Sequence, residues 1–290
     1  MWAYLVRRLL QAFVILFIIT MLCFILTRLS SDPMAQYSEK TGMTAADRAA
    51  IRARLGLDQP MPVQYVKWLG LALQGDLGAS FFSHQPVLTM IKQRLPLTLI
   101  LMGTAEIITI LLSLLLGLVA AVKQYSFTDN LITSFSFVGY SMPIFFIAYG
   151  CITIFAVQFK AWHLPYLPTG ADIWSFKDPV QLARHLILPV FSLVAITTAG
   201  YARYLRSTIL EVLGQDYVRT AHAKGLSNRA VLFKHALRNA ILPFVTIVGL
   251  DIPFLLGGAL VTESVFAWPG MGRLFWEYAQ RGDYPVVLGV

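Results

Sequence analysis

The sequence is poor in charged residues. Asp, Glu, Lys and Arg make up 13% of its 290 residues, whereas soluble domains carry roughly 25%. Hydrophobic residues account for 57%, and the mean hydropathy is +0.66. So little charge excludes an ordinary soluble enzyme or binding domain and indicates a chain that is embedded in a membrane.

Several chemical signatures are also missing. The two cysteines, Cys23 and Cys151, both fall inside apolar segments, so a disulfide framework is not expected. The five histidines lack metal-ligand spacing, and no Ser/His/Asp or Cys/His set converges in the sequence. The dipeptide Gly-Lys, which a phosphate-binding loop needs, occurs nowhere. We therefore predict no catalytic, metal-binding or cofactor-binding residues in this chain.

Long apolar runs are what the sequence has instead. A membrane helix needs roughly 20 mostly apolar residues, and the ending YPVVLGV is too short to span, so it predicts the start of a further helix. We predict an all-α, polytopic membrane protein, a single domain over residues 1–290, with five complete spans plus the start of a sixth. The five complete windows are Leu9–Thr27, Leu95–Val122, Asn130–Phe159, His185–Ala202 and Ala240–Thr262.

Positive charge is concentrated in one stretch. Between Tyr201 and Leu242 the chain has seven basic residues against two acids, which predicts a cytoplasmic location under the positive-inside rule. Arg7 and Arg8 place the N-terminus on the same side. The segments 30–94 and 160–184 are therefore expected outside, the first because long loops cross regardless of their charge.

The sequence RTAHAKGLSNRAVLFKHALRNAILPF forms the core of that basic stretch. Gly225 follows a short helical run from about Tyr217, and glycine suits the left-handed position just past a helix end. Ser227 then predicts the N-cap of a second, amphipathic helix, with Pro243 leading into the fifth span. The pattern predicts two helices joined by a glycine turn, which we call the elbow.

Three functions compete for the elbow. A helix-turn-helix DNA reader is disfavoured, because a segment strung between two membrane spans reaches a DNA groove poorly. An amphipathic lipid anchor is the plainest alternative, since basic faces attract anionic headgroups. The third is a docking element for a cytoplasmic partner.

The run DYVRTAHAKGLSNRAVLFKHALRNAILPFVTIVG resembles the cytoplasmic signature of permease subunits of binding-protein-dependent ABC importers. The alanine, the glycine four residues on and the downstream Leu-Pro of that signature match Ala221, Gly225, Leu242 and Pro243. Arg219 stands where the wider family has an acid, a form similar to the dipeptide, oligopeptide and nickel branch. The stretches RLGLDQP, GDLGASF, GYSMPIF, TESVFAWPGMGRLF and RGDYPV agree with that branch in order, so the resemblance covers nearly the whole chain.

The resemblance implies a type I ABC importer transmembrane domain in a bacterial inner membrane. It makes residues 206–239 a coupling-helix segment, residues 30–94 an outer segment and residues 263–283 an outer re-entrant scoop; an interfacial turn would give nearly the same geometry as the scoop. The implied partners are a second homologous permease subunit, two cytoplasmic ATPase subunits that bind the ATP, and an extracytoplasmic substrate-binding protein. The residues assigned to ATPase coupling are Arg219, Ala221, Lys224, Gly225, Leu226 and Arg229.

Two acids and one proline are candidates for the translocation pathway. Glu106 and Asp251 are the charges inside the expected spans, and intramembrane carboxylates are functional hypotheses by default. A hydrogen-bonded structural role explains them equally well. Pro143 should kink the third span near its middle, which suits either a pathway wall or a purely structural bend.

The function expected from these patterns is ATP-driven import of di- or oligopeptides, with this chain as half of the pathway and no enzyme itself. A nickel- or glutathione-type permease is the alternative within the family. A secondary carrier coupled to protons through Glu106 or Asp251 is a less favoured rival, because no inverted repeat is visible and the elbow would have no role. A membrane-embedded enzyme lacks its catalytic residues.

Overall fold

The computed structural model describes residues 2–30, 58–170, 178–257 and 259–290. Within these ranges the chain is helical, apart from turns and one isolated bridge between Ala79 and Pro86. Five helices are long and apolar enough to cross a membrane: Trp2–Leu29, Val87–Val122, Ile144–Ala161, Pro179–Leu213 and Asn228–Pro253. The predicted all-α class with five spans is therefore confirmed. Residues 31–57 of the expected outer segment lie outside the described residues.

The chain divides into two compact units, one of residues 1–94 and 274–290 and the other of residues 95–273. In the first, α1 (Trp2–Ser30) contacts α4 (Met61–Leu73) and α15 (Tyr284–Gly289). The ring of Tyr65 stacks within 6.1 Å of the Trp68 ring and meets Phe24 edge-on at 5.6 Å. Tyr65 and Trp68 therefore pack against α1 through the ring of Phe24.

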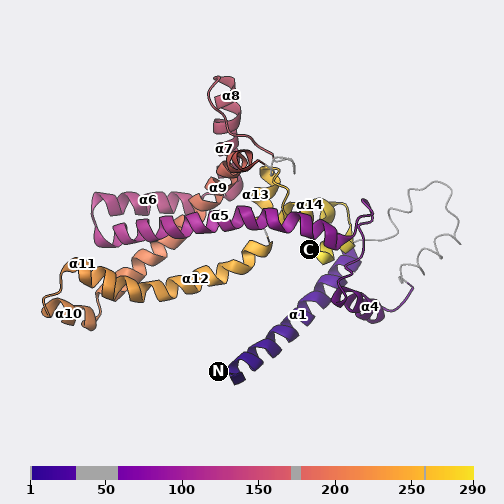
Figure 1. The fold of residues 1–290 in the computed structure, drawn as a ribbon, viewed down its shortest axis with the longest axis horizontal. Helices are drawn as coiled ribbons and strands as arrows, with labels where there is room; N and C mark the ends of the chain where they lie inside the picture. The colour runs from indigo at the N-terminus through magenta and orange to yellow at the C-terminus, as the bar shows by residue number, and fades with distance from the viewer. Residues whose placement is uncertain (1, 31–57, 171–177, 258) are drawn as a thin grey trace. The chain divides into compact units, whose positions relative to one another are not determined.

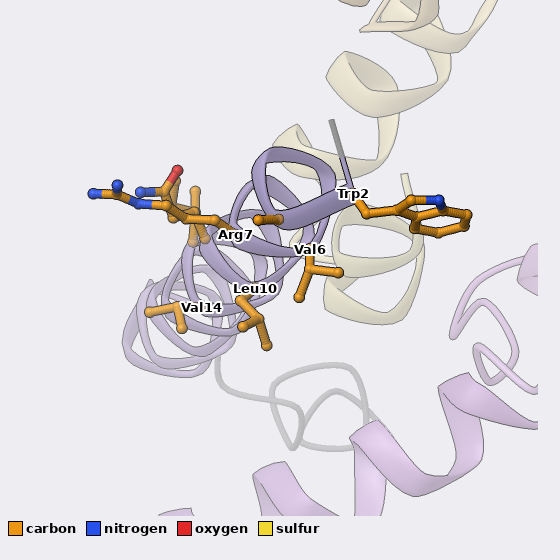
Figure 2. Close-up of a pocket in the computed structure, with 8 residues that line it drawn as sticks. Trp2, Val6, Arg7, Leu10 and Val14 are labelled. Carbon is orange, nitrogen blue, oxygen red and sulfur yellow. The ribbon is translucent and has the colours of Figure 1, made fainter.

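The N-terminal half of α1 has few contacts. Figure 2 shows Trp2, Val6, Leu10 and Val14 extending from this helix, with Arg7 on the side opposite Trp2. Trp2 is 80% exposed and Leu10 is 63% exposed. Such an apolar surface on a helix of this length suits contact with lipid or with another membrane helix.

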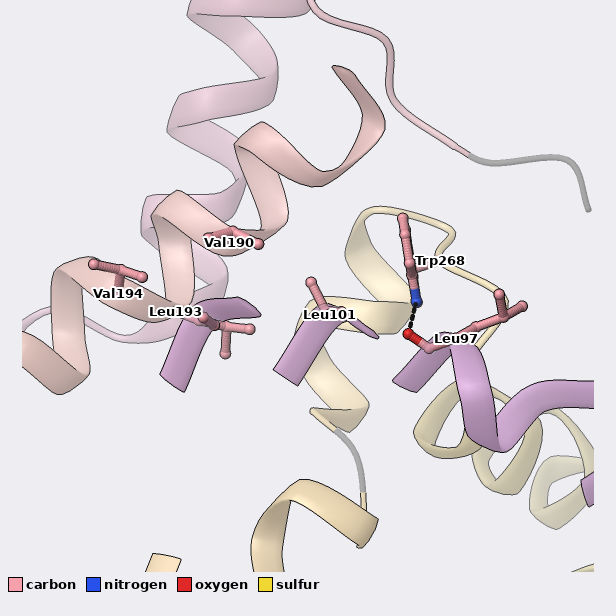
Figure 3. Close-up of a cluster of buried hydrophobic side chains, with 7 residues drawn as sticks. Leu97, Leu101, Val190, Leu193, Val194 and Trp268 are labelled. Atoms are coloured by element: carbon pink, nitrogen blue, oxygen red, sulfur yellow. Dashed lines mark hydrogen bonds between the residues drawn. The ribbon is translucent and has the colours of Figure 1, made fainter. Parts of the chain in front are cut away.

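The second unit is built around α9 (Pro179–Leu213). Figure 1 shows α6 (Phe127–Ser141) running beside α9 and the long α5 (Val87–Val122), and α12 (Leu237–Gly257) also contacts α9. Leu101 of α5 and Leu193 of α9 share a buried cluster with Trp268, whose indole N–H donates to the carbonyl of Leu97 at 3.1 Å (Figure 3).

The prediction of one kinked helix across Asn130–Phe159 is wrong. The helix α6 ends at Ser141, and the extended backbone of Met142 and Pro143 separates it from α7 (Ile144–Cys151). The cause is local, because a residue before proline is pushed out of the helical region. After the break, α7 continues through the π-helix η1 (Ile152–Gln158) into α8 (Phe159–Ala161), and Figure 1 shows the chain turning sharply away from α6.

The predicted start and end of the fifth span are also corrected. The second elbow helix and the span form one continuous helix, made of α11 (Asn228–Ala230), the π-helical η3 (Val231–Ala236) and α12. Pro243 lies inside α12 rather than at its entrance. At the other end α12 stops at Gly257, and Thr262 belongs to a separate helix, α13 (Leu260–Val265). The last long helix is α14 (Met271–Gln280).

Candidate functional site

The elbow closes with a pair of backbone hydrogen bonds at the end of α10 (Asp216–Ala223). The N–H of Leu226 donates to the carbonyl of Ala221 at 3.3 Å, and the N–H of Gly225 donates to the carbonyl of His222 at 2.9 Å. This pairing is the Schellman motif, which needs a left-handed residue just after the helix. Gly225 has φ of +81°, so the predicted left-handed glycine is confirmed.

The predicted N-cap of the next helix is confirmed as well. The side-chain oxygen of Ser227 accepts a hydrogen bond from the N–H of Ala230 at 3.3 Å. A cap of this kind contributes about 1 kcal/mol to helix stability. Helix end, glycine and helix start thus follow within a few residues, and local sequence alone determines the turn.

One face of the elbow is buried and the other is open. Val218 and Ala221 of α10 pack with Val231 and against Leu213 at the end of α9. Among the residues predicted to couple to an ATPase, Ala221 is therefore a packing residue that is 5% exposed. The others lie on the exposed side: Arg219, Lys224, Gly225, Leu226 and Arg229.

Charge on the open face is only weakly engaged within the chain. The Nη1 of Arg219 lies 3.4 Å from Oδ1 of Asp216, with both side chains exposed. Exposed pairs of this kind contribute little free energy of folding. The guanidinium of Arg219 and the exposed apolar side chain of Leu226 are consequently available to a partner surface.

A buried ion pair connects the region above the elbow to α6. Nε and Nη2 of Arg206 each donate to the carboxylate of Asp129 at 2.7 Å, and Asp129 is 1% exposed. The N–H of Tyr125 adds a third donor at 2.8 Å. The hydrogen bond with Arg206 lowers the pKa of the Asp129 carboxyl. This clamp fixes the turn between α5 and α6 to the C-terminal third of α9, and sequence analysis missed it because its members are 77 residues apart.

The two intramembrane acids meet on one tyrosine. The hydroxyl of Tyr201 lies 3.2 Å from Oε1 of Glu106 and also bonds Oδ2 of Asp251. A phenol carries one hydrogen, so it donates to one carboxylate at a time. The ring of Tyr201 packs edge-on against Phe244. Glu106, Tyr201 and Asp251 lie on α5, α9 and α12, so the cluster joins three membrane helices, and no sequence signal singled out Tyr201.

Glu263 organises a buried turn in the segment that the sequence predicts as an outer scoop or interfacial turn, and we call it the outer turn. The hydroxyl of Thr98 donates to its Oε1 at 2.7 Å, and the N–H of Arg273 donates to its Oε2 at 3.0 Å. Glu263 is fully buried. A carboxylate at the first turn of α14 also faces the positive end of that helix dipole. The acid thus joins α13, α14 and α5.

A second buried acid organises the ends of the first unit. Oδ2 of Asp283 accepts hydrogen bonds from the hydroxyl of Ser80 at 2.6 Å and from the N–H of Phe81 at 2.9 Å. The ring of Phe81 lies 4.7 Å from that of Tyr284. These contacts join the stretches GDLGASF and RGDYPV. Phe81 is therefore a packing residue.

The described residues contain no group of three or more His, Cys, Asp or Glu side chains that could hold a metal ion. The structure brings Glu106 and Asp251 together around Tyr201. Pro143 is not part of this cluster and lies in the break between α6 and α7. The elbow presents exposed basic side chains, and the Tyr201 cluster holds two carboxylates around one hydroxyl.

Comparison with protein families gives two matches. A family described as binding-protein-dependent transport system inner membrane component matches residues 113–290. A second model, for the N-terminal part of such membrane components, matches residues 1–102. Together the matches cover most of the chain, the elbow included.

Individual relatives are similar over nearly their whole length. The chain is 42% identical over 294 residues to an oligopeptide transport system permease protein of Bacillus subtilis, covering 100% of this chain and 91% of that protein. It is 41% identical over 292 residues to a putative peptide permease protein of Brucella ovis, with the same coverage. A glutathione transport system permease protein of Escherichia coli is 38% identical over 285 residues, with 98% and 89% covered.

One solved structure has a similar fold. The crystal structure of an amino acid ABC transporter with histidines superposes with a TM-score of 0.52 and covers 69% of this chain and 84% of that one. At 16% identity this likeness concerns the fold alone.

Proposed function

Because the chain belongs to the family of binding-protein-dependent transport system inner membrane components, we propose that it forms half of the pathway through which an ATP-driven importer moves peptides across the bacterial inner membrane. The peptide and oligopeptide permeases among its relatives support this substrate class. The observation that carries the proposal is the elbow, a rigid turn with a buried inner face and an exposed basic outer face.

In this proposal α10 is the coupling helix and rests in a cleft of a cytoplasmic ATPase subunit. Its outer residues Arg219, Lys224 and Arg229 meet the ATPase, while Val218 holds the helix against the rest of the chain. Movement of α10 passes directly into the membrane, because α11, η3 and α12 form one continuous helix. The Asp129–Arg206 clamp passes the same movement from α9 to α6.

The partners follow from the same proposal. A second homologous permease subunit completes the pathway, two ATPase subunits hydrolyse the ATP, and a substrate-binding protein delivers the peptide to the outer face. The chain itself contributes no step of ATP hydrolysis. The exposed apolar residues of α1 contact lipid or the second permease subunit.

We assign Glu106 and Asp251 to the pathway as a proposal of its own, with Tyr201 holding them together. Asp251→Asn removes a charge but keeps an oxygen that accepts the Tyr201 hydrogen bond. Uptake of peptides with a free amino group should fall, and thermal stability should change by less than about 1 kcal/mol. Normal uptake by a destabilised variant would assign the cluster to structure alone.

A glutathione-type substrate is the second candidate, favoured by the relative that carries that name. Glutathione and ordinary peptides both present a free amino group and a carboxylate. The Tyr201 cluster therefore does not discriminate between the two substrates. Competition between labelled peptide and unlabelled glutathione for the purified binding protein decides between the two.

The deciding experiment is transport by the reconstituted complex. The permease is purified with its copurifying subunits, placed in proteoliposomes and supplied with binding protein and labelled peptide. We expect the rate of peptide uptake to require ATP and to be independent of a proton gradient. Uptake driven by the gradient without ATP, from a chain that copurifies with no ATPase, would instead support a proton-coupled carrier.

A further inference from the structure

Arg203 is a charged residue on a membrane helix with an unusual setting. Its guanidinium carbon lies 5.0 Å from the centre of the Tyr140 ring and 5.5 Å from that of Phe137. Its side chain is exposed and makes no hydrogen bond or ion pair within the described part of the chain. The charge is therefore placed by aromatic rings and keeps its hydrogen-bond donors available.

The depth of this charge follows from how α6 and α9 pair. Arg206 bonds Asp129 in the first turn of α6, whereas Gly139 lies against the carbonyl of Ala195. The two helices consequently run antiparallel, and Arg203 leaves α9 about one turn from the level of Asp129.

The Arg203 side chain extends away from the cytoplasmic end of the helix pair. Its guanidinium reaches Phe137 and Tyr140, which follow Asp129 by eight and eleven residues. At about 1.5 Å per residue, the Cα atoms of these two residues lie roughly 12–17 Å along α6 from that of Asp129. A lysine or arginine that seeks headgroups extends toward the near membrane surface, so this one is held near the middle of a hydrocarbon core of about 30 Å.

An arginine at that depth needs water or an anion. Charged side chains inside a membrane face a water-filled cavity or a partner, because lipid tails do not solvate a charge. Guanidinium groups stack on aromatic faces and present paired N–H donors in the plane, which match the two oxygens of a carboxylate. Phe137 is 53% exposed and Tyr140 is 60% exposed, so the aromatic platform opens on the same side as the charge.

We infer that Arg203, Phe137 and Tyr140 form a carboxylate-binding site in the translocation pathway, which receives the C-terminal carboxylate of the peptide during its passage. The inference rests on the proposed function, since it places the site in a peptide pathway. A phospholipid phosphate offers similar chemistry, but headgroups lie at the membrane surfaces, far from these rings. Tyr201, two residues before Arg203, carries the acid cluster on another side of α9.

The test uses the complete complex in proteoliposomes with a peptide and the same peptide amidated at its C-terminus. Uptake of each is divided by the measured occupancy of the binding protein. Arg203→Gln should reduce uptake of the free-carboxylate peptide about tenfold, since a hydrogen bond to a charged group is at least that strong, and should change uptake of the amide little. Uptake of the free-carboxylate peptide by Arg203→Lys should lie between that of the wild type and that of Arg203→Gln. The control is Arg238→Gln, which removes an exposed arginine of α12 and should match the wild type.

A second arm reads the site directly. Cysteine is placed at position 203 in a chain in which Cys23 and Cys151 are replaced by alanine, and the complex is treated with charged thiosulfonate reagents. A positively charged reagent should restore uptake of the free-carboxylate peptide, a negatively charged one should not, and saturating peptide should slow the labelling during turnover.

Three outcomes would overturn the inference. Equal losses for both peptides would indicate a contact with the second permease subunit, and uptake that tracks the content of anionic lipid would indicate a lipid phosphate. Wild-type uptake by Arg203→Gln would leave the site without a role. Failure of the wild-type complex to import peptide with ATP would count against the proposed function itself, which is a separate result.

Discussion

Of the helix ends that close with the same pair of backbone hydrogen bonds, two differ in every other respect. At the elbow Leu226 bonds back to Ala221, and at the outer turn the N–H of Trp268 donates to the carbonyl of Glu263 at 2.8 Å. The left-handed position is Gly225 in the first and Ala267, with φ of +50°, in the second.

The surroundings of the two turns also differ. A β-carbon on Gly225 would meet nothing within 4 Å, so this glycine serves only the backbone conformation. Beyond Ala267, a β-carbon on Gly270 would collide with the carboxylate of Glu263, and one on Gly272 would lie 2.7 Å from the Cα of Leu260. The elbow therefore needs glycine for its backbone conformation, and the outer turn needs glycine because no β-carbon fits there.

The largest effect should come from filling that space. Gly272→Ala places a methyl group against the backbone of Leu260, which cannot move aside as a side chain can. We expect the free energy of unfolding to fall by about 3 kcal/mol, the upper range for overpacking. Thermal denaturation of the purified complex measures it, with Gly249→Ala as the control because its β-carbon would meet nothing within 4 Å. Equal stability of the two variants would contradict the packed description of the outer turn.

Removing the buried charge should have a somewhat smaller effect. Glu263→Gln keeps the shape but replaces one acceptor oxygen with a donor, which faces either the Thr98 hydroxyl or the Arg273 N–H. We expect a loss of about 2 kcal/mol. The same measurement checks it, with Glu211→Gln on the exposed end of α9 as the matched control. A neutral result would mean that Glu263 does not hold the turn together.

At the elbow the loss of stability should be modest and the loss of function complete. Gly225→Val forces a branched residue into the left-handed region at a cost of about 1 kcal/mol. We expect normal membrane insertion, weaker association with the ATPase and no ATP-dependent uptake.

Two controls isolate the role of the elbow turn. Gly225→Asn should retain ATPase binding, since asparagine tolerates the left-handed conformation. The paired Lys234→Gln and Arg238→Gln variant tests a lipid anchor, which depends on charge instead of one glycine. A pull-down in which the valine variant binds the ATPase normally and the charge variant does not would reverse our assignment.

The smallest effect should be a gain. Ala267→Gly relieves a left-handed alanine, and the gain is partly offset by the greater freedom of glycine in the unfolded chain. We expect an increase in stability of less than about 1 kcal/mol. A loss above that amount would show that the methyl group of Ala267 contributes packing that exceeds its conformational cost.

Sequence patterns predicted the elbow and missed the centre of the outer turn for a physical reason. The elbow is specified by residues within one short stretch, namely Gly225 and Ser227, whose turn and cap preferences are local. Glu263 depends on Thr98, and Tyr201 on Glu106 and Asp251, so their roles appear only when distant helices are side by side.

The break at Pro143 lies between these cases. Proline predicted a disturbance at the right residue, and the choice between a kink and a full break depends on what the flanking helices pack against. In the structure α6 and α7 each pack on α9, which supports the extended Met142–Pro143 link.

The hydrogen bond between Thr98 and Glu263 also constrains the order of events during synthesis. Its partners are 165 residues apart, and a bacterial ribosome adds about 5–20 residues per second, so roughly 10–30 s separate the synthesis of the two. During that interval α5 is already made while the carboxylate that will accept the Thr98 hydroxyl does not yet exist. The contact between Thr98 and Glu263 therefore forms only after both α5 and α13 have been made.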